Sequence, residues 1–298
     1  MKVAIYSHTP IAGAPWNQYQ CMKRYLPNEE IRFIQQRVQY KDGREFPKDL
    51  VLTDRGASAW LKSADVVHIH NYLPTELKGY LRPKKQKIIA TLHSVPRQGN
   101  WQDLLHYAQK TFTIRQPMQM REYVGFDTLP NMFDIWNYKA DATKTYDGVI
   151  NIVYCPTNKH ANNVTSSKGY NTVMPLLVQI KKERGNEVNI ISFSDVEYLE
   201  NLKRKSLGHI TIDDICGATF HLTSIEGCCT EQAVLTSVPK DWGYPFIYTT
   251  LSNLKEKIDY FLDNRDKLAY AANYSRSWLE TNWNPKTMVS EYLTAYNS

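Results

Sequence analysis

The loop at residues 7–15, after the first apolar segment, contains residue types that allow its backbone to bind a phosphate. Residues 7–15 read SHTPIAGAP and lie between a predicted strand and a predicted helix. Gly13 has no side chain, so the backbone there can approach a ligand closely, and the N-terminus of the following helix can face an anion. A plain turn accounts for the same residues, so the loop alone leaves both interpretations open.

Histidines end two further apolar segments of the first half. His68 and His70 close the run ADVVHIH, and His93 follows the run IIATL. A histidine at the carboxyl end of a strand can donate a hydrogen bond to a ligand or respond to developing charge. For His68 and His70, packing inside the core is an equal alternative.

These residues need a scaffold, and the apolar runs alternate with helical patterns in a way typical of parallel sheets with helices on both faces. The predicted strands are residues 2–7, 31–35, 66–70, 88–92, 111–114, 127–129, 149–154, 188–193, 209–212 and 233–236. The predicted helices are residues 17–25, 101–108, 170–183, 196–205, 254–279 with an internal break, and 285–296. In such open sheets a ligand binds beyond the carboxyl ends of the strands.

The length of 298 residues predicts two domains, because a single core rarely grows this large. A polar segment, 137–148, interrupts the alternation and is interpreted as the linker. We therefore expect an α/β protein with two Rossmann-like, doubly wound domains facing a cleft, over residues 1–145 and 146–298.

Composition narrows the class of protein. The net charge of +6 mildly favours anionic partners. The run of Lys203, Arg204 and Lys205 is interpreted as a solvated helix face. No zinc-finger or RNA-recognition signature appears, and the five cysteines form no CxxC pair, which argues against disulfides and structural zinc. No apolar run approaches the roughly 18 to 20 residues of a membrane span, so we expect a soluble protein in a bacterial or phage-infected cytoplasm.

The order of these motifs along nearly the whole chain resembles the GT-B glycosyltransferases, in particular the large retaining group 1, or family 4-like, enzymes. Thr91, Leu92 and His93 are similar to that family's T-x-H motif, whose histidine faces the donor sugar. The run LPNMFD at 129–134 is similar to the L-P-N-x-x-D element that closes the first domain. The resemblance implies an acceptor-side first domain and a second domain that binds a nucleotide-sugar.

The same resemblance assigns basic residues to the leaving group. The family carries two of them in the loop that here spans 155–169, and they neutralise the diphosphate as the sugar–phosphate bond breaks. Lys168 matches the second position. Lys159 is the candidate for the first, where the family prefers arginine.

Glu226 is the candidate for one of the family's two glutamates. If it were the first, Glu231 would be the second, but the two are five residues apart where the family places eight. As the second glutamate, at a helix start, Glu226 would accept hydrogen bonds from the ribose hydroxyls. This register is preferred, and it places Ala218 where the family has its first glutamate.

Asp213 or Asp214 is then expected to take over the contact with the sugar hydroxyls, although helix capping or exposure explains this pair equally well. Backbone N–H groups of residues 218–220 are expected at the phosphate. The resulting candidate set is catalytic His93, Lys168 and Asp214, with donor contacts from Gly13, Lys159, Lys168, Thr219, Ser224 and Glu226. No metal ligand and no cofactor beyond the nucleotide-sugar are expected, because lysines and amide dipoles replace the metal ion in the family.

The predicted activity is transfer of a sugar from a UDP- or GDP-sugar to an acceptor hydroxyl, with retention at the anomeric carbon. The acceptor is a surface glycan or lipid-linked sugar, or a hydroxymethylated base of phage DNA, since the chain is short, basic and rich in aromatic residues that can stack on an extruded base. A sugar-nucleotide epimerase of the same fold and a catalytically inactive sugar-binding scaffold are the alternatives.

Overall fold

The computed structural model describes residues 1–37, 46–93, 101–156, 159, 167–193 and 196–298. They form two compact units, of which unit 1 comprises residues 1–134 and 285–298 and unit 2 comprises residues 135–284. Residues 94–100 after His93, and most of the loop expected to hold the two basic residues, lie outside the described residues. Among the described residues, no helix is both long and apolar enough to cross a membrane.

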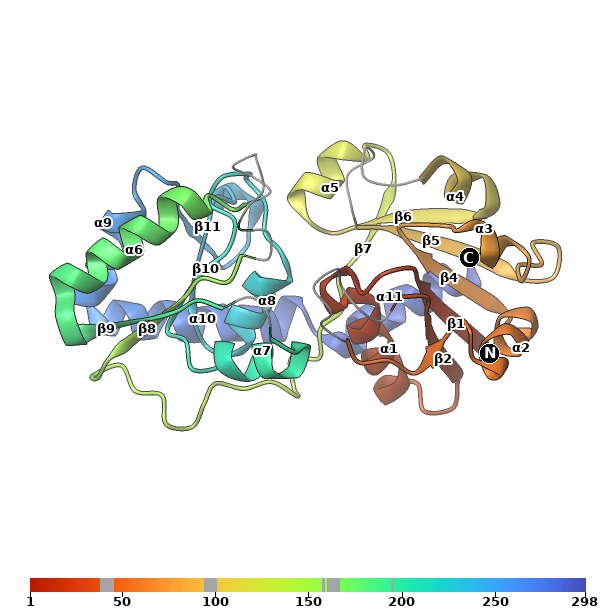
Figure 1. Cartoon of the computed structure of the whole chain (residues 1–298), viewed down its shortest axis with the longest axis horizontal. Helices are drawn as coiled ribbons and strands as arrows, with labels where there is room; N and C mark the ends of the chain where they lie inside the picture. The colour runs from red at the N-terminus through yellow and green to blue at the C-terminus, as the bar shows by residue number, and fades with distance from the viewer. Residues whose placement is uncertain (38–45, 94–100, 157–158, 160–166, 194–195) are drawn as a thin grey trace. The chain divides into compact units, whose positions relative to one another are not determined.

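Unit 1 contains a parallel sheet of seven described strands in the order β3-β2-β1-β4-β5-β6-β7 (Figure 1). The strands are β1 (Lys2–Ser7), β2 (Glu30–Gln35), β3 (Leu50–Val51), β4 (Val66–His70), β5 (Lys87–Leu92), β6 (Lys110–Ile114) and β7 (Asp127–Leu129). The helices are α1 (Ala14–Tyr25), α2 (Arg55–Ser63), α3 (Thr75–Lys78), α4 (Trp101–Tyr107), α5 (Pro117–Glu122) and α11 (Pro285–Asn297). The central strands are buried along their length, as expected for a sheet covered on both faces.

Helices cover the two faces of this sheet in different ways. One face packs on apolar residues of α2, α3 and α4, such as Leu61, Leu77 and Leu104. On the other face, α1 packs against β2 and α11 packs against α1 and β7. Both chain termini therefore belong to unit 1 (Figure 1).

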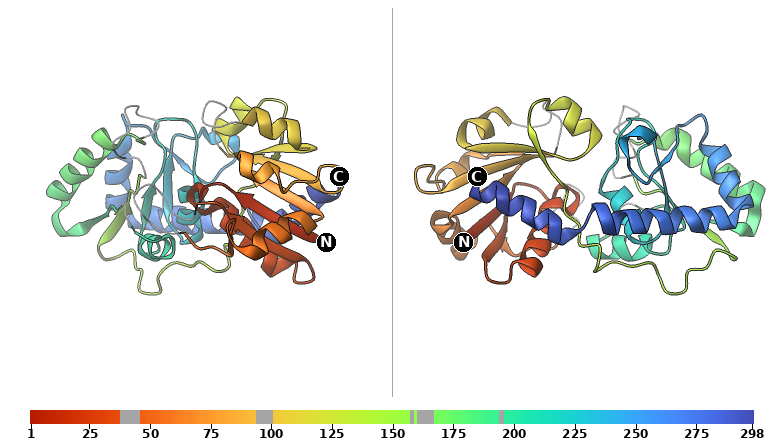
Figure 2. Two further views of the ribbon diagram at one scale, coloured as in Figure 1. Left: turned by 45° about the vertical axis from the view of Figure 1, so that its right-hand side comes forward. Right: turned by 180° about the vertical axis from the view of Figure 1, so that it is seen from behind.

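Unit 2 contains a parallel sheet of five described strands in the order β12-β11-β10-β8-β9. The strands are β8 (Ile150–Val153), β9 (Val188–Ile191), β10 (Ile210–Ile212), β11 (Ala233–Thr236) and β12 (Ile247–Tyr248). The helices are α6 (Tyr170–Arg184), α7 (Tyr198–Lys205), α8 (Leu222–Cys229), α9 (Leu254–Asp263) and α10 (Arg265–Asn282). Apolar residues of α6 and α9 form the core on one face, and α10 packs against α8 and β11 on the other (Figure 2).

The grouping of residues differs from the expected division at 145 in two places. Residues 135–145 lie in unit 2, where the Lys144 ammonium donates to the carbonyls of Thr230 and Glu231 at 2.7 and 2.5 Å. Residues 285–298 lie in unit 1, because α11 buries Met288, Tyr292 and the rest of its apolar face there. The segment interpreted as a linker is thus partly anchored, and the last helix returns to the first unit.

Candidate functional site

The strand order of unit 2 reverses between β8 and β10, which is the point where open parallel sheets bind ligands beyond their carboxyl ends. The chain leaves β8 through Tyr154, whose hydroxyl donates to the carbonyl of Lys168 at 2.9 Å. Lys168 and Gly169 both adopt positive φ, at 52° and 74°, just before α6 begins. A side chain at Gly169 would meet Cys216 Sγ at 3.0 Å. These contacts fix Lys168 at the switch point.

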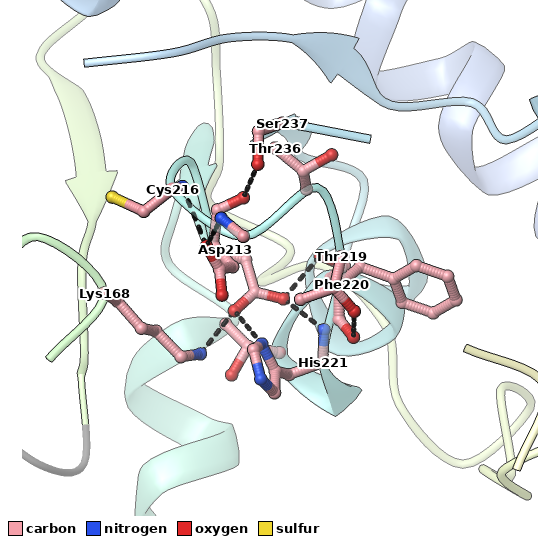
Figure 3. Close-up of polar contacts among 12 residues, drawn as sticks. Lys168, Asp213, Cys216, Thr219, Phe220, His221, Thr236 and Ser237 are labelled. Carbon is pink, nitrogen blue, oxygen red and sulfur yellow. Dashed lines mark hydrogen bonds and ion pairs between the residues drawn. The ribbon is translucent and has the colours of Figure 1, made fainter. Parts of the chain in front are cut away.

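Asp213, the residue after β10, collects four hydrogen bonds at this edge (Figure 3). Its Oδ1 atom accepts from Lys168 Nζ and contacts His221 Nδ1 at 3.2 Å. Its Oδ2 atom accepts from the backbone N–H of His221 at 2.6 Å and from Ser224 Oγ at 2.7 Å. Asp213 is completely buried, so both carboxylate oxygens are occupied by protein donors.

The charge of Asp213 is stabilised by these partners. Burial alone would raise the pKa of its carboxyl group, but the charges of Lys168 and His221 and their hydrogen bonds hold that pKa well below its ordinary value. Asp213 is therefore an ionised acceptor at neutral pH. The structure brings two residues of the predicted set, Lys168 and Ser224, together on a carboxylate that the set omitted.

Asp214 is also buried, but its carboxylate accepts from backbone N–H groups instead of from side chains of the Asp213 cluster. Its Oδ1 atom accepts from the backbone N–H groups of Cys216 and Gly217, both at 2.8 Å, which closes the turn after β10. Its Oδ2 atom is buried and has no hydrogen-bond partner among the described residues. Asp214 thus forms a turn, which neither helix capping nor exposure described, while a catalytic role for it stays a prediction.

Residues 218–220, which were expected to bind the phosphate, make some of their hydrogen bonds to other protein groups. Ala218, with φ of 47°, donates its N–H to Ser237 Oγ at 2.8 Å, and that hydroxyl lies 3.2 Å from the carbonyl of Asp214. Thr219 is buried and its hydroxyl makes only a long contact, 3.5 Å, to the carbonyl of Phe220. Ser237 therefore ties this loop to the end of β11.

Helix α8 begins at Leu222, with His221 as its N-cap. Glu226 lies in the middle of this helix and not at its start, which corrects the local structure expected for it. A side chain at Gly227 would meet Thr211 and Val234 at 3.1 Å, so a glycine is needed for α8 to lie this close to the sheet. The close packing places Glu226 beside the sheet, only 5% exposed.

Glu226 has a buried cationic partner. Its Oε2 atom lies 2.6 Å from Nζ of Lys205, and Lys205 is 7% exposed. Burial has the largest single effect and lowers the pKa of Lys205, but the charge and hydrogen bond of Glu226, together with Cys155 and Asp213, outweigh it and the net shift is upward. The interpretation of Lys205 as part of a solvated face was wrong, because Tyr198, Leu202 and Lys205 share the buried face of α7.

Two residues of this site were missed by the sequence reasoning. Lys205 had a usable signal, since it follows Tyr198 and Leu202 at the i, i+4 and i+7 spacing of a buried helix face. His221 had none, because the start of α8 was not predicted there. Lys159, in contrast, was predicted, and its ammonium lies 5.7 Å from the centroid of the Tyr170 ring.

In unit 1, the glycine-containing loop has unusual backbone geometry. Ile11, Ala12 and Gly13 all have positive φ, at 46°, 51° and 84°, which only the glycine adopts without strain. Gly13 is the N-cap of α1 and its N–H donates to the carbonyl of Pro10 at 2.9 Å. The backbone geometry leaves the plain-turn interpretation open, and a phosphate contact at Gly13 stays a prediction.

The histidines of unit 1 form a buried row at the carboxyl ends of β4 and β5. The rings of His68 and His70 stack with centroids 4.6 Å apart, and His70 Nδ1 lies 2.7 Å from His93 Nε2. His68 also contacts the Tyr296 hydroxyl at 2.9 Å and Thr91 Oγ1 at 2.7 Å. Burial lowers the pKa of His68 and of His93 to about 3, and that of His70 well below its ordinary value.

All three rings are therefore neutral at physiological pH, and His68 and His70 pack as core residues. The predicted contact of His93 with the donor sugar stays a prediction. Across the described residues of both units, no group of three or more histidine, cysteine, aspartate or glutamate side chains is arranged to hold a metal ion.

Comparison with known proteins places this geometry in a structural class. No protein-family model matches the sequence, and no curated protein matches it significantly. Among solved structures, the chain is similar to sucrose-phosphate synthase from Thermosynechococcus elongatus, with a TM-score of 0.67 and 12% identity over 100% of this chain and 98% of the other. It is similar to the Anabaena protein HepE, solved with UDP and glucose, with a TM-score of 0.67 and 10% identity over 99% of both chains.

A putative UDP-N-acetylglucosamine 2-epimerase from Listeria monocytogenes is also similar, with a TM-score of 0.57 and 9% identity over 98% of this chain and 94% of the other. At such identities the likeness establishes the fold alone. The chain has the GT-B fold, with two parallel-sheet α/β domains, as the sequence predicted.

Proposed function

We propose that this protein is a glycosyltransferase that moves a sugar from a nucleoside-diphosphate-sugar to an acceptor hydroxyl, with the donor bound by unit 2. The observation that carries the proposal is the position of Lys168, whose ammonium is held by Asp213 at the switch point of the sheet and beside the N-terminus of α8. An ammonium and a helix N-terminus at one edge are the groups that favour a diphosphate.

In this mechanism Lys168 stabilises the charge that develops on the leaving diphosphate as the sugar–phosphate bond breaks. Such stabilisation is effective when the donor group is held in place before the reaction begins. The fully buried Asp213 carboxylate provides that restraint. We propose that transfer retains the anomeric configuration and needs no divalent ion, because the resemblance assigns the neutralising role to lysine and backbone dipoles.

We assign Glu226 to the ribose hydroxyls of the donor. A carboxylate can accept from two vicinal hydroxyls, and the Lys205 ammonium stabilises its charge in a buried position. The proposal keeps Thr219, Ser224 and Lys159 as donor contacts. It also keeps His93 as a catalytic residue and Gly13 as a donor contact, because the resemblance assigns these positions, and Asp214 as a catalytic residue in place of the family's first glutamate.

The acceptor is proposed to be a glycan or lipid-linked sugar, in keeping with the similar structure of HepE, which was solved with UDP and glucose. An assay that offers hydroxymethylated DNA beside sugar acceptors tests the alternative acceptor. If DNA is the acceptor, DNA binding should also fall steeply as the salt concentration rises. A cytoplasmic location is part of the same proposal.

The likeness to a putative UDP-N-acetylglucosamine 2-epimerase favours epimerisation of a nucleotide-sugar as the second candidate function. The two functions differ in what they consume. An epimerase converts the donor without an acceptor and keeps the sugar–nucleotide bond at the end, whereas a transferase releases the nucleoside diphosphate.

A donor screen tests the proposal. Thermal unfolding is measured with UDP, GDP and their sugar conjugates, since a ligand at about 100 times its Kd adds roughly 2.7 kcal/mol of stability. Release of UDP or GDP is then followed with and without EDTA. The proposal expects protection by one base and release that survives chelation. Silence toward every nucleotide-sugar contradicts it, and interconversion of the donor without nucleotide release identifies the epimerase.

A further inference from the structure

His221 is held by one carboxylate at two points, its backbone N–H and its imidazole. Its backbone N–H donates to Asp213 Oδ2 at 2.6 Å, and its Nδ1 atom lies 3.2 Å from Oδ1 of the same residue. Because Asp213 is ionised, it only accepts hydrogen bonds, so the proton of this contact resides on Nδ1 of the imidazole. The ring orientation is fixed by this arrangement, and because Nδ1 already carries a proton, Nε2 donates a hydrogen bond when that nitrogen is protonated as well.

Among the described residues, this arrangement leaves the Nε2 edge of the imidazole for a ligand. The side chain of His221 is 41% exposed although Asp213 is completely buried, so the ring extends from the buried carboxylate toward solvent (Figure 3). A histidine held through Nδ1 and open at Nε2 has the geometry of a group that contacts a substrate.

The neighbours of His221 define the chemistry of that ligand. Lys168 Nζ donates to the same Oδ1 atom of Asp213 that His221 contacts, so the ammonium and the imidazole are adjacent on a single oxygen. His221 is also the N-cap of the eight-residue helix α8, whose N-terminus favours an anion. The Lys168 ammonium, the adjacent imidazole and the helix N-terminus together favour a phosphate group over a neutral hydroxyl.

We propose that His221 is a catalytic residue of this site, whose Nε2 atom donates a hydrogen bond to the distal phosphate of the nucleoside-diphosphate leaving group. The inference rests on the proposed glycosyltransferase function and adds a residue that the resemblance did not supply. No bond to the imidazole forms. As the bond between the anomeric carbon and the phosphate oxygen breaks, its electron pair stays on that oxygen, and the Lys168 ammonium and the hydrogen bond from Nε2 of His221 stabilise the resulting charge.

Two substitutions separate this role from a purely structural one. In His221→Asn, the side-chain amide can take the place of Nδ1 and hold Asp213, but nothing reaches the position of Nε2. In His221→Gln, the longer side chain can reach the position of Nε2 but loses the contact that Nδ1 makes. His106→Asn, at an exposed histidine of unit 1, is the control.

The experiment measures affinity for UDP, GDP and inorganic pyrophosphate by calorimetry, and kcat for release of nucleotide, in the full-length protein. His221→Asn is expected to lower diphosphate affinity and kcat by roughly 10-fold or more. It should leave the affinity for uridine and guanosine unchanged, and His221→Gln should retain more of both quantities. The opposite order, with Asn equal to wild type and Gln impaired, shows that His221 only holds Asp213 and overturns the proposal.

A second measurement needs no variant. Acylation of wild-type histidines by diethyl pyrocarbonate is mapped by mass spectrometry with and without pyrophosphate, and the proposal expects protection at His221 but not at His106. Protection without turnover of any nucleotide-sugar supports the phosphate contact and refutes the glycosyltransferase function. Turnover that both His221 variants retain in full refutes the contact alone, and neither binding nor turnover refutes both.

Discussion

Nζ of Lys205 lies 2.6 Å from Oε2 of Glu226, and both side chains are almost fully buried. A buried ion pair contributes little net stability when intact, but removing one partner leaves an uncompensated charge. Lys205→Met is therefore expected to lower the free energy of unfolding by about 3 to 5 kcal/mol, measured by urea titration. The double substitution Lys205→Met with Glu226→Leu should recover much of this loss.

The same helix offers a matched control for that prediction. Arg204 pairs with Glu200 at 2.7 Å, but both side chains are more than 40% exposed. Arg204→Met should cost less than about 1 kcal/mol, as surface pairs usually do. Equal effects of the two substitutions would show that Lys205 does not stabilise a buried charge.

Asp213 and Asp214 are adjacent, but substitution by asparagine is expected to lower the stability of unit 2 by different amounts at the two positions. Both oxygens of Asp213 accept from donors, so an amide NH2 at either position would face another donor. Asp214 has one oxygen without a partner among the described residues, and the amide can occupy that side. Asp213→Asn is expected to destabilise unit 2 by about 2 kcal/mol or more, and Asp214→Asn by clearly less. Equal losses on thermal unfolding would contradict this assignment.

The buried histidine row predicts loss of stability in acid. The pKa of His68 and of His93 falls from the ordinary value of 6.5 to about 3 because of burial. The unfolded chain then binds more protons than the folded protein below pH 6.5, so this stability is fully present above pH 6.5 and is lost as the pH falls toward 3. Each ring contributes a slope of up to about 1.4 kcal/mol per pH unit.

Urea unfolding between pH 7 and 4.5, above most carboxylate titrations, measures this slope. His68→Asn should reduce the proton uptake on unfolding by about one proton at the acid end of this range. A free energy of unfolding that does not change over this pH range, or an unchanged proton uptake in the variant, would refute the conclusion that the buried histidines are neutral in the folded protein.

The C-terminal helix is expected to be essential for unit 1. Tyr292 donates to the carbonyl of Pro130 at 2.9 Å, and the Tyr296 hydroxyl contacts His68 and Gln18 at 2.9 Å each. Removing residues 285–298 exposes the surface that α11 covers and should destabilise unit 1 by more than about 5 kcal/mol. Removing Ser298 alone should leave the unfolding temperature unchanged. A truncated chain that unfolds like the full-length protein would contradict the assignment of α11 to unit 1.

Much of the fold could be predicted because long buried strands produce clear apolar runs. The bounds of β1, β4, β7 and β11 agree with the sequence prediction, and the break between α9 and α10 falls at Asn264. Helices α2, α3 and α5 were missed because each is short and follows no extended periodic pattern. That α11 belongs to unit 1 depends on tertiary packing, which the linear order of elements does not reveal.

The candidate site was only partly predictable for a related reason. Lys168, Ser224 and Glu226 were predicted from the order of motifs, and they lie on or beside the elements at the switch point. Asp213 was considered only as an alternative to Asp214, and His221 and Lys205 were not predicted, because Asp213 and His221 meet at the start of α8 and Lys205 reaches Glu226 from 21 residues earlier. Side-chain pairing of this kind has no signature in sequence spacing.

The central claim is that the ammonium of Lys168 stabilises the leaving diphosphate. Its most direct test is kcat for release of UDP or GDP from the preferred nucleotide-sugar by wild type, Lys168→Met and the exposed control Lys182→Met. Lys168→Met is expected to lower kcat by about 100-fold or more, because it removes a charge-stabilising group from the transition state. Lys182→Met should match wild type. A Lys168→Met protein that folds normally and keeps wild-type kcat would contradict the account.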